Sequence, residues 1–120
     1  MSKPVVSFER EFQVWNYTAG HGRLLLRSPK GPGRPTRVDI LFTDVRALEL
    51  RTNLATLAIQ EVEPAEIAQR PVKAHQILET GHKIFLLKSA EWVGCVVAGA
   101  VHWHEDEGEY GEPSGLLESS

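Results

Sequence analysis

Two histidines near the end of the chain, His102 and His104, are the side chains best suited to bind a metal ion. They are two residues apart in a segment that alternates like a β-strand, so both imidazoles should project from the same face. Imidazole and carboxylate groups are ligands of divalent transition metals, and an acidic run follows directly. A third ligand would have to come from His21, His82 or a carboxylate across the sheet. Two half-exposed histidines at a strand end are the alternative, because a pair with this spacing is common.

The acidic run contains Glu105, Asp106 and Glu107, with Tyr110 close behind. Its spacing does not match the calcium loop of an EF-hand, which needs oxygen ligands at alternate positions and a glutamate at the twelfth. The last twenty residues hold six of the 16 acidic residues and no Lys or Arg. We interpret this run as a solvated turn or as an acidic surface for a basic partner protein.

A basic cluster lies in the first third of the chain. Five basic residues and no acidic one lie between Arg23 and Arg37, among them Lys30 and Arg34. Residues 33–35 read Gly-Arg-Pro, the core of a minor-groove hook, but a proline precedes them where the hook needs an arginine. The pI of about 5.9 also argues against a nucleic-acid partner. The basic and acidic clusters are therefore solvated patches, docking sites for a partner, or each other's partners across the fold.

Motifs for catalysis are missing from the sequence. It contains no Gly-x-Ser-x-Gly elbow and no phosphate-cradling glycine loop. The single cysteine, Cys95, lies in an apolar run without a basic neighbour, so a core thiol is expected. An enzyme of this sequence would have to use a histidine and a carboxylate as general acid and base. We expect no catalytic residue and no cofactor, unless the histidines bind a divalent transition metal.

Two aromatic residues, Trp15 and Tyr17, alternate with the apolar residues Phe12 and Val14. In a strand this spacing places the aromatic pair on the face opposite the apolar pair. If that face is outside, the pair forms an exposed aromatic patch, and such residues are enriched at binding interfaces. If the sheet is covered on both sides, the pair belongs to the core.

The elements that position these side chains are strands, because apolar residues recur with a period of two rather than 3.6. The segment at 29–35, with three prolines and two glycines, is expected to be a loop. Strands are predicted over residues 8–17, 23–28, 36–42, 45–51, 54–62, 73–80, 83–88 and 92–104, with one short helix near residues 64–70.

About eight antiparallel strands with at most one short helix predict an all-β fold, a barrel or half-barrel. The first two strands are close enough to pair as a hairpin. The strand at 92–104 is apolar on both faces as far as Val101, so it should be central in the sheet or close the barrel. Gly94 and Gly99 within it indicate bends or bulges.

The chain has 120 residues, of which 42% are hydrophobic and 24% charged, the composition of an ordinary globular protein. We expect one β domain over residues 1–108 and a polar, frayed tail over residues 109–120. The N-terminus shows no apolar signal segment, no apolar run is long enough to cross a bilayer, and one cysteine excludes an intrachain disulfide. These features predict a cytoplasmic protein without a membrane partner.

Two segments, Trp103 to Tyr110 and Phe12 to Tyr17 followed by His21-Gly22, resemble a family of small bacterial proteins. The resemblance covers about a quarter of the chain and implies no activity. The residues themselves favour a non-enzymatic protein-interaction module, one that includes its own copy among its partners. The alternative is a metal- or small-ligand-binding β-barrel with His102 and His104 at its mouth.

Overall fold

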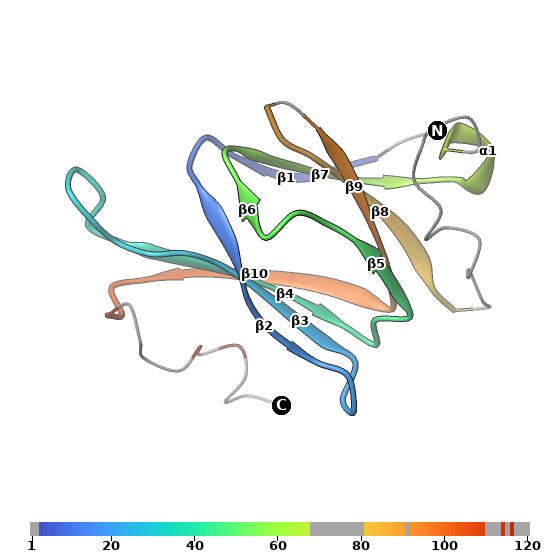
Figure 1. Cartoon of the computed structure of the whole chain (residues 1–120), viewed down its shortest axis with the longest axis horizontal. Helices are drawn as coiled ribbons and strands as arrows, with labels where there is room; N and C mark the ends of the chain where they lie inside the picture. The colour runs from blue at the N-terminus through green and yellow to red at the C-terminus, as the bar shows by residue number, and fades with distance from the viewer. Residues whose placement is uncertain (1–2, 68–80, 91, 110–113, 115, 117–120) are drawn as a thin grey trace.

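The fold is a pair of antiparallel sheets, shown by a computed structural model that describes residues 3–67, 81–90, 92–109, 114 and 116 (Figure 1). Sheet A has the strand order β1-β7-β8-β9-β5 and sheet B the order β10-β4-β3-β2-β6. This confirms the all-β antiparallel class, although the sheets are not found to close into a barrel. The elements are β1 Lys3–Phe8, β2 Phe12–Thr18, β3 Arg23–Ser28, β4 Arg37–Thr43, β5 Ala47–Glu49, β6 Asn53–Leu54, β7 Leu57–Val62, α1 Pro64–Ile67, β8 Lys83–Lys88, β9 Val93–Ala98 and β10 Ala100–Asp106.

The chain passes between the two sheets at a corner formed by Gly99. The Gly99 N–H donates to the Thr43 carbonyl over 2.9 Å, and the Arg46 N–H donates to the Val97 carbonyl over 2.8 Å. A Cβ on Gly99 would lie 3.1 Å from the Asp44 side chain, so this corner favours glycine. The predicted single strand at 92–104 is therefore wrong. It is two strands in different sheets, and its second half, β10, is an edge strand rather than a central one.

Apolar residues fill the space between the sheets and also the far face of sheet A. Along β8 and β9 successive side chains alternate between two separate buried clusters, so both faces of sheet A are apolar there. Cys95 is fully buried in the second cluster, as expected of a core thiol. The main cluster contains Phe12, Leu24, Leu26, Val38, Ile40, Phe42, Val45, Leu54, Leu57, Ile59, Phe85, Leu87, Val96 and Ala98.

Several local predictions are confirmed and one strand was missed. The hairpin of β2 and β3 is present, and residues 29–35 form a loop whose tip is a tight turn with Gly33 at φ 75°. The strand at 3–8 was not predicted, and it pairs with β7. The strand predicted over 73–80 lies outside the described residues. No helix in the described part of the chain has the length and hydropathy needed to span a membrane.

Gly94 in β9 should not tolerate a side chain. A Cβ at this position would lie 2.5 Å from the Glu49 carbonyl oxygen and 2.8 Å from Leu50, because β5 packs closely there. We expect Gly94→Ala to lower the free energy of unfolding by about 1–3 kcal/mol, the usual cost of overpacking. Gly20→Ala, with nothing within 4 Å, is the control and should change it by less than about 0.5 kcal/mol. Urea denaturation of both variants tests this, and equal stabilities would contradict the packing at Gly94.

Candidate interaction surface at the free edge of β10

Two sheets have four edge strands, and three of them carry features that prevent pairing with another chain. In the described residues β5 has three residues and β6 has two, which is too short to offer a ladder. Edge strand β1 contains Pro4, and its register with β7 shifts between Pro4 and Val6. Proline, bulges and short strands are the devices that protect sheet edges. Only β10 lacks all three among these edges.

β10 is long, regular and exposed on its free side. It pairs with β4 over all seven residues, from Ala100 opposite Thr43 to Asp106 opposite Arg37, with no shift in register (Figure 1). Trp103 lies at its centre, opposite Ile40, and 44% of its surface is exposed. An indole of this exposure in the middle of an edge strand is a surface that a partner can cover.

The predicted aromatic pair does not form one patch. The register between β2 and β3 shifts between Val14 and Asn16, and this bulge brings Tyr17 opposite Leu24, a core residue. Trp15 instead lies against the guanidinium of Arg27, 4.8 Å from its carbon atom to the ring centroid. The two aromatic residues are therefore on different faces of sheet B. Tyr17 is 46% exposed, whereas Trp15 is half-buried.

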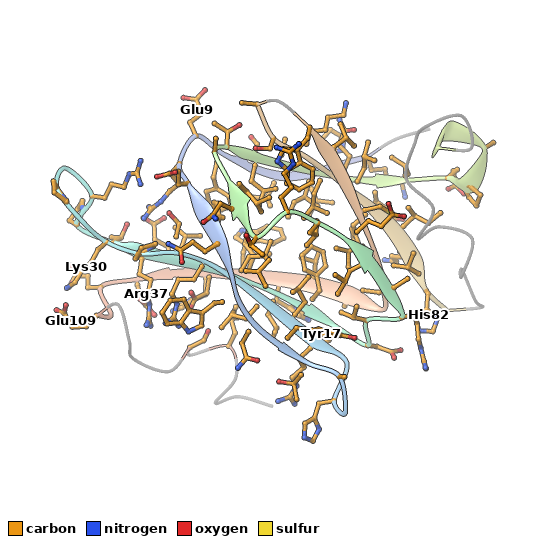
Figure 2. The ribbon with its side chains drawn as sticks, in the orientation of Figure 1. Glu9, Tyr17, Lys30, Arg37, His82 and Glu109 are labelled. Atoms are coloured by element: carbon orange, nitrogen blue, oxygen red, sulfur yellow. The ribbon has the colours of Figure 1, made fainter. Side chains whose placement is uncertain are left out.

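The acidic and basic clusters are each other's partners across the fold. Lys30 Nζ lies 2.7 Å from Glu109 Oε1, and it donates to the Glu107 carbonyl over 3.0 Å (Figure 2). Arg37 holds Asp106 through two hydrogen bonds, of 3.0 Å to Oδ1 and 2.9 Å to Oδ2. The charges of Asp106 and Glu109 are thus paired within the molecule, whereas the carboxylates of Glu105 and Glu107 are exposed.

Two other predicted residues of these clusters, Glu105 and Arg34, do not take part in these ion pairs in the described structure. Glu105 is exposed and accepts a hydrogen bond from the Thr36 hydroxyl. Arg34 is half-buried, and its backbone forms the bridge with Gly31 that closes the loop turn. Tyr110 lies outside the described residues. Of the predicted interaction residues, the structure therefore brings Glu105, Asp106 and Glu107 to the end of β10.

Buried charges on the outer face of sheet B hold the end of β10 against β4. Arg27 and Asp39, each 1% exposed, form a bidentate pair with distances of 2.8 and 3.1 Å. Arg37, beside them, reaches Asp39 at 3.9 Å and Asp106 at the end of β10. Hydrogen bonds from Arg37 lower the pKa of Asp106, and the backbone N–H of Gly108 and the charge of Arg37 lower it further, although partial burial opposes them. Sequence reasoning considered pairing between the basic and acidic clusters but missed the buried Arg27–Asp39 pair, which a hydropathy pattern does not show.

The two candidate metal ligands, His102 and His104, are exposed on β10 and face the same side, as their spacing predicts. His104 Nε2 lies 3.7 Å from Asp106 Oδ2, an oxygen that Arg37 already binds. Within residues 3–67, 81–90, 92–109, 114 and 116, no three histidine, cysteine or acidic side chains are placed to hold a metal ion together. The pair therefore has no third ligand among these residues.

A second polar cluster joins residues that are distant in the sequence. His82 Nε2 lies 2.9 Å from Asp44 Oδ2 and 3.1 Å from Arg46 Nε, which is also 3.3 Å from Asp44 Oδ1. Since one nitrogen cannot both donate and accept, Nε2–H donates to Asp44, and Arg46 is held by the carboxylate. The other ring nitrogen, Nδ1, is buried without a hydrogen-bond partner, and the side chain is 7% exposed. The cluster therefore links the residue before β8 to the turn that follows β4.

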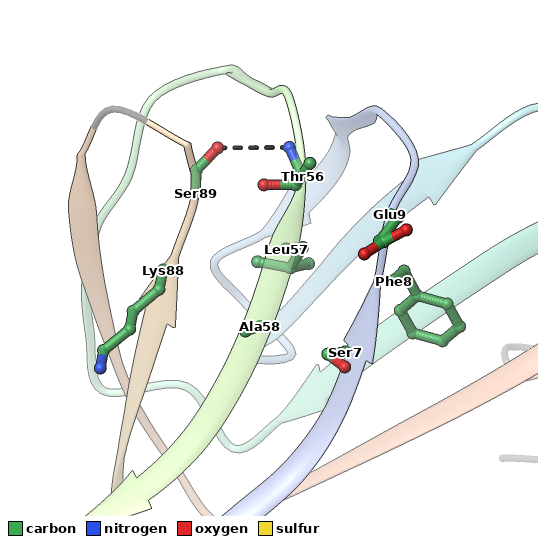
Figure 3. Close-up of a pocket in the computed structure, with 8 residues that line it drawn as sticks. All are labelled: Ser7, Phe8, Glu9, Thr56, Leu57, Ala58, Lys88 and Ser89. Atoms are coloured by element: carbon green, nitrogen blue, oxygen red, sulfur yellow. Dashed lines mark hydrogen bonds between the residues drawn. The ribbon is translucent and has the colours of Figure 1, made fainter.

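A surface hollow lies at the ends of β1, β7 and β8. Its volume is about 320 Å³, and its polar lining includes Glu9, Lys88 and Ser89 (Figure 3). Glu9 and Lys88 lie on opposite sides of the hollow, and the Ser89 hydroxyl faces the Thr56 N–H at 3.4 Å. Ligand sites need polar groups that converge on one point, and these do not.

Comparison of the chain with protein-family models, with curated proteins and with solved structures found no match. The edge of β10 is therefore the feature on which a functional conclusion rests.

Asp106 should contribute stability that depends on pH. Its pKa is lower in the folded than in the unfolded state, so unfolding takes up a proton as the solution becomes acidic. This stability is complete above the ordinary aspartate pKa of about 4 and is lost as the pH falls through the lower folded value. We expect Asp106→Asn to lower the free energy of unfolding at pH 7 by about 1–3 kcal/mol, with the difference from wild type shrinking below pH 4.

Urea denaturation between pH 7 and pH 3 measures this difference. Glu107→Gln removes the same charge from an exposed side chain and is the matched control, which should differ little from wild type at any pH. A deficit of Asp106→Asn that stayed constant across the range would contradict the lowered pKa of Asp106.

Proposed function

We propose that this chain is a non-enzymatic protein-interaction module that binds an extended segment of polypeptide along the free edge of β10. Strand addition of this kind supplies affinity through backbone hydrogen bonds and specificity through alternate side chains. The observation that carries the proposal is the exposed Trp103 at the centre of a seven-residue edge strand without a bulge or proline. The arrangement supports binding because an added strand would cover both the indole and the unpaired ladder.

The structure around β10 favours binding over catalysis. The buried His82 faces Asp44 rather than an open cleft, and the hollow beside Lys88 has no converging polar groups. In contrast, β10 is held in place at one end by Arg37 and at the other by the corner at Gly99. A rigid edge favours binding because little conformational entropy is lost when a partner strand is added.

Random peptides displayed on phage provide a direct test with the intact protein. We expect selection on the immobilised chain to enrich extended sequences with aromatic or β-branched residues, which pair well with Trp103 in a sheet. Binding of these peptides should weaken by about tenfold or more in Trp103→Ser, because interface tryptophans carry a large share of binding energy.

Tyr17→Ser is the matched control, because Tyr17 has nearly the same exposure, 46% against 44%, and lies on β2, three strands from β10. Peptide affinity for this variant should equal that of the wild type, and thermal unfolding of both variants checks that the fold is intact. If no selected peptide distinguishes Trp103→Ser from Tyr17→Ser, the proposal is wrong.

A further inference from the structure

β10 is suited to pair with a copy of itself. We infer that the partner strand is β10 of a second copy of this chain, added antiparallel so that sheet B continues from one molecule into the other. This inference rests on the proposed function and names its partner. The strand runs from Ala100 to Asp106 and centres on Trp103, so full overlap of two copies places both Trp103 side chains at the two-fold axis.

The regular register of β10 supports this pairing. It matches β4 residue by residue without a shift, so its free side presents an evenly alternating ladder along the whole strand. A second β10 presents the same row of backbone N–H and C=O groups. When the two strands pair antiparallel, each provides hydrogen-bond partners for the other. The two indoles, each 44% exposed, would then cover one another across the axis at the distance of a directly opposed cross-strand pair.

The side chains on the outer face of β10 report the register of such a pair. His102 lies in the first half of the strand and Asp106 at its end, both on the outer face of sheet B. Antiparallel pairing turns the second strand end for end, so His102 of one copy lies opposite His104 and diagonal to Asp106 of the other. Both histidines are exposed, and among the described residues the close charged contact of either side chain is the one between His104 and Asp106 of the same strand, at 3.7 Å. They can therefore be replaced to test the register without disturbing the core.

Sedimentation over a concentration series up to about 100 µM measures the assembly of the full chain. We expect wild type and Tyr17→Ser to form dimers, and Trp103→Ser to raise the dimer dissociation constant by about tenfold or more. A dimer that Trp103→Ser does not weaken would overturn the inference, because the contact would then lie elsewhere.

Two double variants test the register of the β10–β10 pair. Thermal unfolding first checks that both are equally stable. In H102E/H104K the glutamate of each copy faces the lysine of the other, which gives two Glu–Lys pairs across the axis, and we expect the dimer to be about two- to thirtyfold tighter than wild type. In H102K/H104K four lysines meet at the axis, and the dimer should weaken by a similar factor. If H102E/H104K weakens the dimer, the alignment centred on Trp103 is wrong.

Sedimentation and peptide binding together distinguish failure of self-pairing from failure of the proposed interaction function. A wild-type chain that stays monomeric over the whole concentration range overturns the inference. If selected peptides still bind that monomer in a Trp103-dependent way, the interaction function stands with another protein as the partner. If they do not, both proposals fail.

Discussion

The geometry of β10 depends on one buried side chain, Arg37. Its guanidinium is 3% exposed, and a buried charge of this kind is strongly destabilising unless it is paired. Asp39 on its own strand lies 3.9 Å away, and the closer partners within the described residues include Asp106 and the Glu109 carbonyl, at 2.9 and 3.1 Å. These come from the end of β10 and the segment after it. Arg37 can therefore be buried only when the end of β10 lies against β4, and this fixes the register of the whole strand.

The same side chain explains the segment that follows β10. A Cβ on Gly108 would lie 2.4 Å from the Arg37 guanidinium, so only glycine lets the backbone pass this close. Beyond it, Glu109 meets Lys30 on the loop between β3 and β4. The basic and acidic clusters of the sequence thus pair in part with each other inside the molecule. Beside these pairs lies the edge of β10 with its exposed indole.

The alternation of apolar residues was enough to predict where most strands lie in the sequence. It did not predict which strands pair with each other in the sheets. The bounds of β3 and β8 agree with the prediction at both ends, because each strand lies between clear turn residues. The segment at 92–104 is apolar on both faces, and this pattern is the same whether a strand stays in one sheet or crosses at Gly99 into another. Edge or central position depends on pairing with β4 and β5, which lie about fifty residues earlier, and local periodicity does not report it.

The candidate site was only partly accessible to sequence reasoning for similar reasons. The bulge at Trp15 reverses the alternation after it, so Trp15 and Tyr17 were wrongly assigned to one face. Acidic and basic clusters were recognised, and their mutual pairing was one of the alternatives considered. Trp103 could not be identified as exposed, because its exposure follows from the position of β10 at the edge of sheet B in the described part of the chain.

The four edge strands of this molecule differ in whether they carry features that prevent pairing with another chain. Three edges show proline, a bulge or extreme shortness, which keep other chains from pairing with them. If the fourth edge were equally in need of protection, one substitution, such as lysine for Trp103, would supply it at little cost to the core. The strand instead carries a large aromatic residue at its centre and is fixed at both ends, by Gly99 and by Arg37. An exposed indole on a rigid, regular edge gains most when a strand is added, and adding a strand requires no rearrangement of the fold.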